Sequence, residues 1–351
     1  MRRRTLGRLS VALVLCVLGV VVVAVSGALE TVAPISEDSH PVLPSLGVTT
    51  HLSGLTDAGR RTEFARLATM GASWIRVGVP WYSVQPTPRT VSASELGALD
   101  QIMAAATTAG LRVLFIGDQA PSWAGGGGAT ASMPAAYGSF MGLLAEHFRG
   151  HGPHGTSPAY EIMNEPDGRQ EDGQPWAAPS DYAAAACSAF HAIKSQDRGA
   201  IVVAGSLDVK DWAPWLRSAF QAGLGTCFDV LSAHPYSHVN VLDQIRAVAG
   251  AEGSPDVRIW VTEFGFSTCG DLQQSCVSEA DQASLLVERL EELRRHYPWV
   301  PVAMIYEDRD EPSNPAAAPE RAFGLLTTTD DGARMVAKPA VAAVQALYRG
   351  M

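Results

Sequence analysis

The sequence predicts a (β/α)8 barrel of the TIM type, an α/β fold made of one domain that follows an N-terminal signal segment. After residue 44, short runs rich in Val, Ile and Leu alternate eight times with segments of helical pattern, over about 305 residues. Continuous apolar strands of this kind are typical of a parallel sheet that helices cover on both faces. An open doubly wound sheet is the alternative, but the first expected strand and turn, LGVTTHLSG, lack the G-x-G-x-x-G pattern of a phosphate-binding turn.

The first 28 residues have the pattern of a signal peptide. Four arginines precede an apolar run, and Ser26-Gly27-Ala28 supplies the small residues that stand before a cleavage site. An uncleaved signal anchor is the alternative, because the run from Leu9 to Val25 is near the lower length limit of a spanning helix. In both cases the arginines keep the N-terminus inside, so we expect a secreted or cell-surface protein. Membrane attachment is expected only if the segment stays uncleaved.

Residues 29–44 are polar and contain prolines, as a linker does, and the barrel domain is expected over residues 45–351. The expected strands are apolar runs of four or five residues each: Leu46–Thr50, Ser73–Val77, Arg112–Ile116, Tyr160–Met163, Ile201–Ala204, Val230–Ala233, Arg258–Thr262 and Val302–Tyr306. The expected helices are mostly longer and lie between these runs: Thr62–Met70, Ser94–Ala109, Tyr137–Phe148, Asp181–Ser195, Trp212–Gln221, Val241–Val248, Ser278–His296 and, closing the barrel, Val336–Tyr348.

The charge of the chain excludes some classes of partner. The formal net charge is −10, and removal of the four arginines of the signal segment leaves −14. A protein this acidic repels polyanions, so nucleic acid and anionic lipid surfaces are not expected as partners. With 47% hydrophobic residues the chain has enough apolar surface to form a large core without help from a metal. We expect a monomer.

Four cysteines lie outside the signal segment, and an even number in an oxidising compartment favours disulfides. Cys269 and Cys276 lie in one polar stretch, STCGDLQQSC, where they can close a short loop, which pairs Cys187 with Cys227 by elimination. The spacing is not C-x-x-C and no histidine cluster accompanies it, which disfavours zinc. We therefore expect no metal and no cofactor.

Polar side chains collect where the expected strands end, and in a parallel barrel those ends form the catalytic face. The residues concerned are His51, Arg76, Asp118, Asn164, Glu165, Asp208, His234, Tyr236, Glu263, Glu307 and Asp308. Glu165 in YEIMNEPD and Glu263 in VRIWVTEFGFST occupy matching places on strands three units apart. Two facing carboxylates are typical of glycosidic bond cleavage, because one protonates the leaving oxygen while the other attacks or activates water. A single glutamate of this kind is more often a structural salt-bridge partner, but the matched pair favours catalysis.

The chain from Leu46 to the KPA segment near its end resembles a clan A glycoside hydrolase. Asn164-Glu165-Pro166 matches the strand-four motif of that clan, and TEFG at Thr262–Gly265 resembles its strand-seven motif. The resemblance implies that Glu165 is the general acid/base, that Glu263 is the nucleophile, and that Asn164 binds the sugar 2-hydroxyl.

The same resemblance assigns further substrate-pocket residues. Arg76, in WIRVGVPW, matches the strand-two arginine that positions the nucleophile and keeps it ionised, and His234 and Tyr236, in SAHPYS, match a pair that borders the nucleophile and the reacting sugar. Trp123 and Tyr306 are aromatics near strand ends, and aromatic rings stack on the apolar faces of sugars. The APSWA segment that contains Trp123 is similar to family 39 and its bacterial exopolysaccharide-cleaving relatives, which favours a family 39-like member over a family 5-like cellulase.

The sequence thus predicts a secreted retaining glycoside hydrolase that cleaves O-glycosidic bonds of a polysaccharide or oligosaccharide by double displacement. Its expected partner is the carbohydrate substrate. A non-catalytic, cell-surface carbohydrate-binding barrel is the alternative, although such a protein usually loses one of the two glutamates. An esterase is disfavoured because no G-x-S-x-G nucleophile elbow is present in the sequence.

Overall fold

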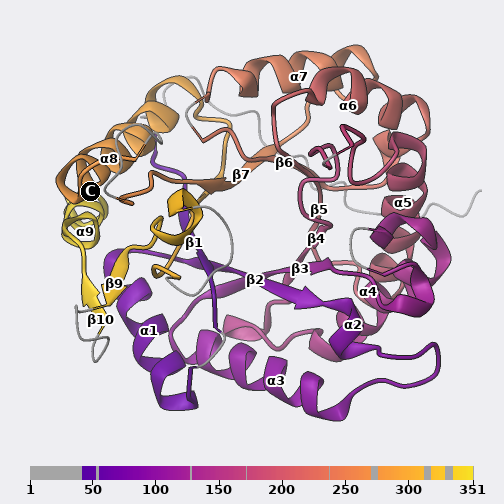
Figure 1. The fold of residues 1–351 in the computed structure, drawn as a ribbon, viewed down its shortest axis with the longest axis horizontal. Coiled ribbons are helices and arrows are strands. Elements are labelled where there is room, and N and C mark those ends of the chain that lie inside the picture. Colours follow the sequence, from indigo (N-terminus) through magenta and orange to yellow (C-terminus); the bar gives the residue numbers. More distant parts are fainter. Residues whose placement is uncertain are drawn as a thin grey trace, which may run out of the picture. The chain divides into compact units, whose positions relative to one another are not determined.

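Eight parallel strands close into a barrel in chain order, as the sequence predicts (Figure 1). The strands are β1 (Ser45–Thr50), β2 (Trp74–Pro80), β3 (Arg112–Asp118), β4 (Ala159–Ile162), β5 (Val202–Leu207), β6 (Val230–Ala233), β7 (Ile259–Phe264) and β8 (Val302–Ile305). Strand β8 pairs with β1, with Ala303 opposite Leu46, and this pairing closes the barrel.

This computed structural model describes residues 42–350 apart from 53–54, 127–128, 171, 237, 270–275, 312–317 and 329–334. The predicted signal segment and the linker up to residue 41 lie outside the described residues. Within the described part, no helix has the length and apolar character that a membrane span needs.

Helices surround the barrel (Figure 1). They are α1 (Asp57–Met70), α2 (Trp81–Val84), α3 (Ala93–Thr108), α4 (Pro134–Phe148), α5 (Pro179–Gln196), α6 (Trp212–Gln221), α7 (Val241–Ala251), α8 (Glu279–His296) and α9 (Pro339–Arg349). Helix α1 begins earlier than expected because the side chain of Thr56 accepts a hydrogen bond from the amide of Gly59 at 3.1 Å and caps it.

The last helix differs from the prediction at its start. Helix α9 begins at Pro339 rather than at Val336, because residues Met335–Ala337 form strand β10, which pairs antiparallel with β9 (Leu326–Thr328). Proline fits the first turn of a helix, where its missing N–H has no partner to lose. The helical pattern in the sequence therefore predicts a start for this helix that is too early, at Val336 instead of Pro339.

Two apolar clusters hold the barrel. The smaller cluster consists of inward-facing side chains from seven strands: Trp74, Leu114, Ala159, Val203, Val230, Trp260, Val302 and Met304. The rings of Trp74 and Trp260 meet edge-on with centroids 5.0 Å apart. The larger cluster lies between the strands and the surrounding helices. Since Trp74, Ala159, Val230 and Val302 begin or nearly begin their strands, the interior is filled with apolar side chains at the amino ends, and polar groups gather at the carboxyl ends.

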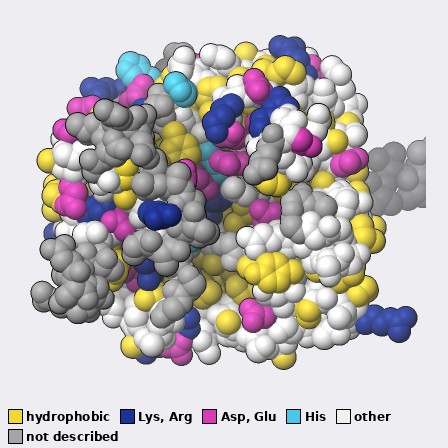
Figure 2. All heavy atoms as spheres, viewed as in Figure 1, with side chains coloured by type: hydrophobic (Ala, Val, Ile, Leu, Met, Phe, Trp, Pro, Cys, Tyr) yellow, Lys and Arg dark blue, Asp and Glu magenta, His cyan; other side chains and the backbone are white. Residues whose placement is uncertain are grey.

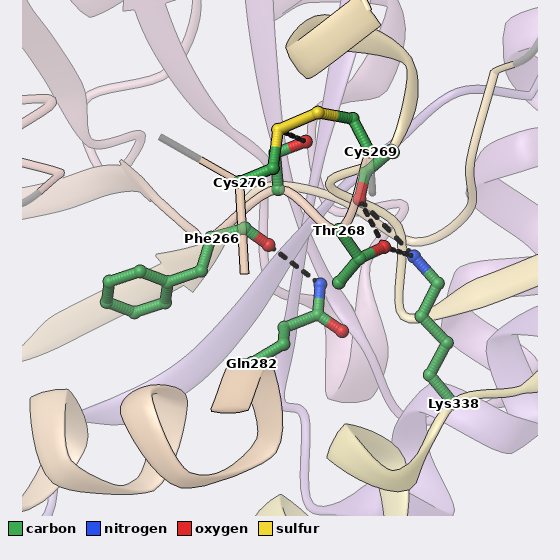
Figure 3. Close-up of a disulfide and its surroundings, with 8 residues drawn as sticks. Phe266, Thr268, Cys269, Cys276, Gln282 and Lys338 are labelled. Carbon is green, nitrogen blue, oxygen red and sulfur yellow. Dashed lines mark hydrogen bonds between the residues drawn. A yellow bond between two sulfur atoms is a disulfide. The ribbon is translucent and has the colours of Figure 1, made fainter. Parts of the chain in front are cut away.

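Disulfides join Cys187 to Cys227 and Cys269 to Cys276, which is the expected pairing. Figure 3 shows the second bridge beside two anchoring side chains, from α8 and from the residue before α9. Gln282 donates a hydrogen bond to the carbonyl of Phe266 at 2.9 Å, and Lys338 donates one to the hydroxyl of Thr268 at 2.8 Å. These contacts tie the segment that follows β7 to the outer helices.

Candidate active site

A cavity of about 1130 Å³ opens at the carboxyl ends of the strands. Most of the predicted site residues line it: Arg76, Asn164, Glu165, His234, Tyr236, Glu263 and Tyr306, together with His51, Asp118 and Asp208. Figure 2 shows acidic, basic and histidine side chains gathered in the hollow near the middle of this face. The strand ends therefore bring residues as far apart in the chain as His51 and Tyr306 into one polar cavity.

Arg76 on β2 links three strands through one buried guanidinium group. Its Nη1 forms an ion pair with Glu263 on β7, and its Nη2 donates a hydrogen bond to Oδ1 of Asn164 at 2.8 Å. Its Nε donates to Oε2 of Glu161 on β4 at 2.5 Å. The planar fork of arginine allows these contacts at once, which fixes the positions of both carboxylates.

Glu263 is the more enclosed of the two predicted catalytic glutamates. The phenol of Tyr236 donates a hydrogen bond to its Oε2 at 2.8 Å, and Nδ1 of His234 lies 3.6 Å from the same oxygen. Burial alone would raise the pKa of this carboxyl, but the charges of His234 and Arg76 and the hydrogen bonds outweigh burial and hold the pKa below its usual value. Glu263 is therefore ionised at neutral pH.

Glu165 lies just after β4 and is more open, since 28% of its side chain is exposed compared with 8% for Glu263. Its Oε1 hydrogen bonds with Nδ1 of His234 at 2.8 Å, and Nε2 of that histidine hydrogen bonds with Oγ1 of Thr262 at 3.1 Å. Burial lowers the pKa of His234, but the two carboxylates outweigh burial and raise it. His234 thus lies between the two glutamates, with its Nδ1 in contact with both.

The backbone around the cavity contains several residues in the left-handed region, where side chains other than glycine are disfavoured. Glu165 has φ 42°, Ser206 has φ 41° and Tyr236 has φ 37°. The hydroxyl of Ser206 accepts the amide hydrogen of Glu165 at 3.1 Å and donates to the carbonyl of Met163 at 2.8 Å, which holds the turn. Such conformations cost about 1–3 kcal/mol each and gather at functional sites.

A second histidine–carboxylate pair lies at the ends of β1 and β8. His51 forms an ion pair with Glu307, and its amide donates to Oδ1 of Asp308 at 3.0 Å. Burial lowers the pKa of His51, but Glu307 and its acidic neighbours outweigh burial and raise it to about 9. Burial raises the pKa of Glu307 to about 7. Tyr306 lies between the end of β8 and Glu307 in the sequence. Its ring packs edge-on against the rings of Tyr236 and Phe323.

The prediction for Trp123 is not supported by the structure, because this residue is not among those that line the cavity. Its indole N–H donates to the carbonyl of Gln85 at 3.1 Å, and its ring packs edge-on against Trp81 with centroids 5.4 Å apart. Trp123 therefore packs a loop against the outer core.

Glu161 was not singled out from the sequence, although it is fully buried and contacts Arg76 directly. The available signal was an acid in the middle of the apolar strand YEIM, where only an inward-facing partner can compensate a charge. Phe323, which follows the last barrel strand, was also missed.

Two groups of side chains in the described part bring potential metal ligands within 4.8 Å of one another: Glu165 with His234 and Glu263, and His51 with Glu307 and Glu311. In the first group the guanidinium of Arg76 already neutralises Glu263. In the second, His51 forms an ion pair with Glu307, and its Nδ1 lies 3.9 Å from a carboxylate oxygen of Glu311. The described contacts in both groups are those of ion pairs.

The family model for cellulase (glycosyl hydrolase family 5) matches residues 36–299, more than half of the chain. A comparison with curated protein sequences finds no match. Among solved structures, a family 39 glycoside hydrolase from Bacteroides cellulosilyticus WH2 is similar with 18% identity and TM-score 0.65, covering 87% of this chain and 64% of that one.

Two further solved structures are similar at the level of the fold. An exo-β-1,4-mannosidase from Opitutaceae bacterium strain TAV5 has 16% identity and TM-score 0.64, with 88% of this chain and 59% of that one covered. A family 5 subfamily 18 protein from Streptomyces cattleya, in complex with Manβ1-4GlcNAc, has 18% identity and TM-score 0.64, with coverage of 87% and 80%. The chain thus spans less than two thirds of the length of the first two structures.

Proposed function

Because the chain belongs to the cellulase family, glycosyl hydrolase family 5, and is a glycoside hydrolase of the retaining clan A, we propose that Glu263 is its nucleophile and Glu165 its general acid/base. Membership of clan A confirms the predicted resemblance. Within the clan the matching family model is that of family 5, whereas the APSWA segment favours family 39, and a family 39 enzyme is among the similar structures.

The observation that carries the proposal is the spacing of the two carboxylates. Oxygens of Glu165 and Glu263 lie within 4.8 Å of one another. In retaining enzymes the two carboxyl groups are about 5–5.5 Å apart, whereas inverting enzymes need about 6.5–9.5 Å to admit a water between them. The short spacing supports direct attack by a carboxylate on the sugar.

The surroundings of each glutamate support its proposed role. Glu263 is ionised and held by Arg76 and Tyr236, so it can attack the anomeric carbon to form a glycosyl-enzyme while Glu165 protonates the leaving oxygen. Glu165 then takes a proton from the incoming water, which attacks the same carbon and releases Glu263. Its greater exposure and contact with His234 support this exchange of a proton with water. Asn164, fixed by Arg76, is proposed to bind the sugar 2-hydroxyl.

The substrate we propose is an oligosaccharide or polysaccharide, with Arg76, Asn164, His234, Tyr236 and Tyr306 among the residues that contact it. The volume of the cavity, about 1130 Å³, is enough for more than one sugar ring. One similar structure is that of an exo-β-1,4-mannosidase and another is a complex with Manβ1-4GlcNAc, so β-mannosides belong in the first panel of substrates.

The test of the mechanism is NMR of the first-formed sugar from the native enzyme together with two variants. Glu165→Ala should still be glycosylated by substrates with good leaving groups, and added azide should rescue it as a glycosyl azide of retained configuration, because azide needs no general base. Glu263→Ala should form no glycosyl-enzyme. An inverted first product from the native enzyme would overturn both assignments.

We also propose that the chain is exported and that its signal segment is removed near residue 28. The two disulfides support an oxidising compartment. Intact mass of the exported protein before and after reduction tests both points: the expected mass begins near Leu29 and gains four hydrogens on reduction. Four free thiols in the exported protein would contradict the proposal.

A further inference from the structure

We propose that Glu161 is a positioning residue that shares the charge of Arg76 with Glu263 and thereby keeps Glu263 more strongly nucleophilic than Arg76 alone would leave it. This inference rests on the proposed role of Glu263 as nucleophile. Glu161 itself touches neither the cavity nor the reacting atoms, and it acts through the arginine.

Both carboxylate oxygens of Glu161 accept a hydrogen bond from a buried side chain. Its side chain is fully buried inside the barrel on β4. Oε2 accepts a hydrogen bond from Nε of Arg76 at 2.5 Å, and Oε1 accepts one from the hydroxyl of Ser232 on β6 at 2.7 Å. That hydroxyl also accepts the amide hydrogen of Ser206 at 2.7 Å, which places Glu161 and the turn of Glu165 in one hydrogen-bond network.

Two carboxylates therefore bind one guanidinium from different sides. Glu161 binds through Nε and Glu263 through Nη1. In the described part of the chain, Arg76 is the cation in ion-pair contact with Glu161. Burial lowers the pKa of Arg76, but the two glutamates outweigh burial and raise it, so the arginine remains charged. One positive charge thus faces two negative charges, and each carboxylate is stabilised less than it would be alone.

Other charged and titratable groups around the pair come from several elements. Facing Glu263 are Arg76 on β2, Glu165 after β4, His234 and Tyr236 after β6, Tyr306 after β8 and Glu320 on η6 (Ala318–Arg321). Facing Glu161 are Arg76, Tyr137 on α4 and Tyr182 on α5. Arg76 is the group that contacts both carboxylates, so the charge of Glu161 reaches Glu263 through it.

Replacement of Glu161 by glutamine separates charge from structure. In Glu161→Gln the amide oxygen can accept from Nε of Arg76, and the amide nitrogen can donate to the hydroxyl of Ser232. That hydroxyl is free to turn to the carbonyl of Ala204, from which it already lies 3.4 Å away. The variant keeps the shape and the hydrogen bonds of the network while it removes one negative charge.

The experiment is the pH profile of kcat/KM for the native protein and Glu161→Gln, measured on an aryl glycoside. The acid limb reports the ionisation of the nucleophile in the free enzyme. Without the competing charge, Glu263 should ionise more readily, so the acid limb should move to lower pH by about one unit. The less basic nucleophile should also lower the plateau several-fold. An acid limb that stays in place, or moves to higher pH, would overturn the proposal.

Two control variants test whether a shift of the acid limb comes from the charge of Glu161. Glu63→Gln changes a buried carboxylate on α1, outside the site, and should leave the acid limb unmoved. If Glu161→Gln does not fold, as judged by its thermal transition, Glu161→Ala removes the same charge and leaves space for a water between Arg76 and Ser232. It should give the same shift. If Glu263→Ala is inactive and the product is retained but neither Glu161 variant shifts the limb, the inference on Glu161 fails while the proposed function stands.

Discussion

Glu263 and Glu307 lie at the carboxyl ends of neighbouring strands, and both are almost fully buried, with 6% and 1% of their surface exposed. Their pKa values nevertheless move in opposite directions. Donors surround Glu263, among them Arg76 and Tyr236, and its pKa falls below the usual value. Burial raises the pKa of Glu307 to about 7, since the contact with His51 lowers it only in part and the nearby acids Asp308 and Glu311 raise it further.

The difference shows that burial does not decide the charge of a carboxylate in this barrel. The interior of the barrel surrounds both carboxylates with a low-dielectric environment that disfavours ionisation. What separates them is the number and kind of donors that neighbouring strands bring to each one. The comparison therefore predicts distinct behaviour for the two glutamates in activity and in pH dependence.

The largest expected effect is that of Glu263→Ala compared with Glu307→Gln. Loss of the proposed nucleophile should lower kcat/KM on a reactive aryl glycoside by about 10⁴-fold or more, because the covalent route disappears. Glu307→Gln should cost about tenfold or less, since Glu307 contacts His51 and is not among the residues that line the cavity. Equal losses in the two variants would contradict distinct roles for Glu263 and Glu307.

Arg76→Lys should have the next largest effect. Lysine keeps the charge but loses the planar fork that holds Glu263, Glu161 and Asn164 together, so kcat/KM should fall by about 10²–10³-fold with the fold intact. The acid limb of the pH profile should also move to higher pH, because Glu263 loses its closest donor. Near-normal turnover in this variant would mean that the arginine is a peripheral salt-bridge partner.

Tyr236→Phe removes one hydrogen-bond donor to Glu263 and leaves the others in place. A hydrogen bond to a charged group contributes about 1.5–3 kcal/mol, so its loss should reduce kcat/KM about ten- to a hundred-fold. Tyr306→Phe is the matched control, because the ring contacts of Tyr306 with Tyr236 and Phe323 remain in that variant. We expect a clearly smaller loss for Tyr306→Phe, and the reverse order would contradict the role given to Tyr236.

A third buried carboxylate extends the comparison to stability. Burial raises the pKa of Glu63 on α1 from 4.5 to about 7, and the positive charge of Arg66 offsets this rise only in part. Because this folded-state pKa lies above the unfolded value, stability is lost as the pH rises from about 4.5 through 7. Glu63→Gln should therefore be more stable than the native protein at pH 8 by about 1–3 kcal/mol, and little different at pH 4.

Thermal unfolding at the two pH values measures this smallest effect. The transition temperature of Glu63→Gln should rise by a few degrees at pH 8. An unchanged transition at pH 8 would show that the ionised carboxyl is solvated in the native protein.

The barrel and the polar cavity could be predicted because their signals are local. The apolar runs fix the strands, and their ends in a parallel barrel must lie together, which brought Arg76, Glu165 and Glu263 into one site. Trp123 could not be placed, because an aromatic ring after a strand looks the same in the sequence whether it stacks on a sugar or on Trp81. The start of α9 depends on the pairing of Met335 with Thr328, a contact between segments that periodicity does not report.

The two disulfides restrict the unfolded chain to very different extents. Cys187–Cys227 closes a loop of 40 residues that contains β5 and α6, whereas Cys269–Cys276 spans 7. On chain-entropy grounds the longer loop stabilises the fold by about 1.5 kcal/mol more than the shorter one. Replacement of Cys187 and Cys227 by serine should therefore lower the thermal transition more than replacement of Cys269 and Cys276. The shorter bridge lies nearer to the cavity in the sequence, because Cys269 follows Glu263 on β7 by six residues.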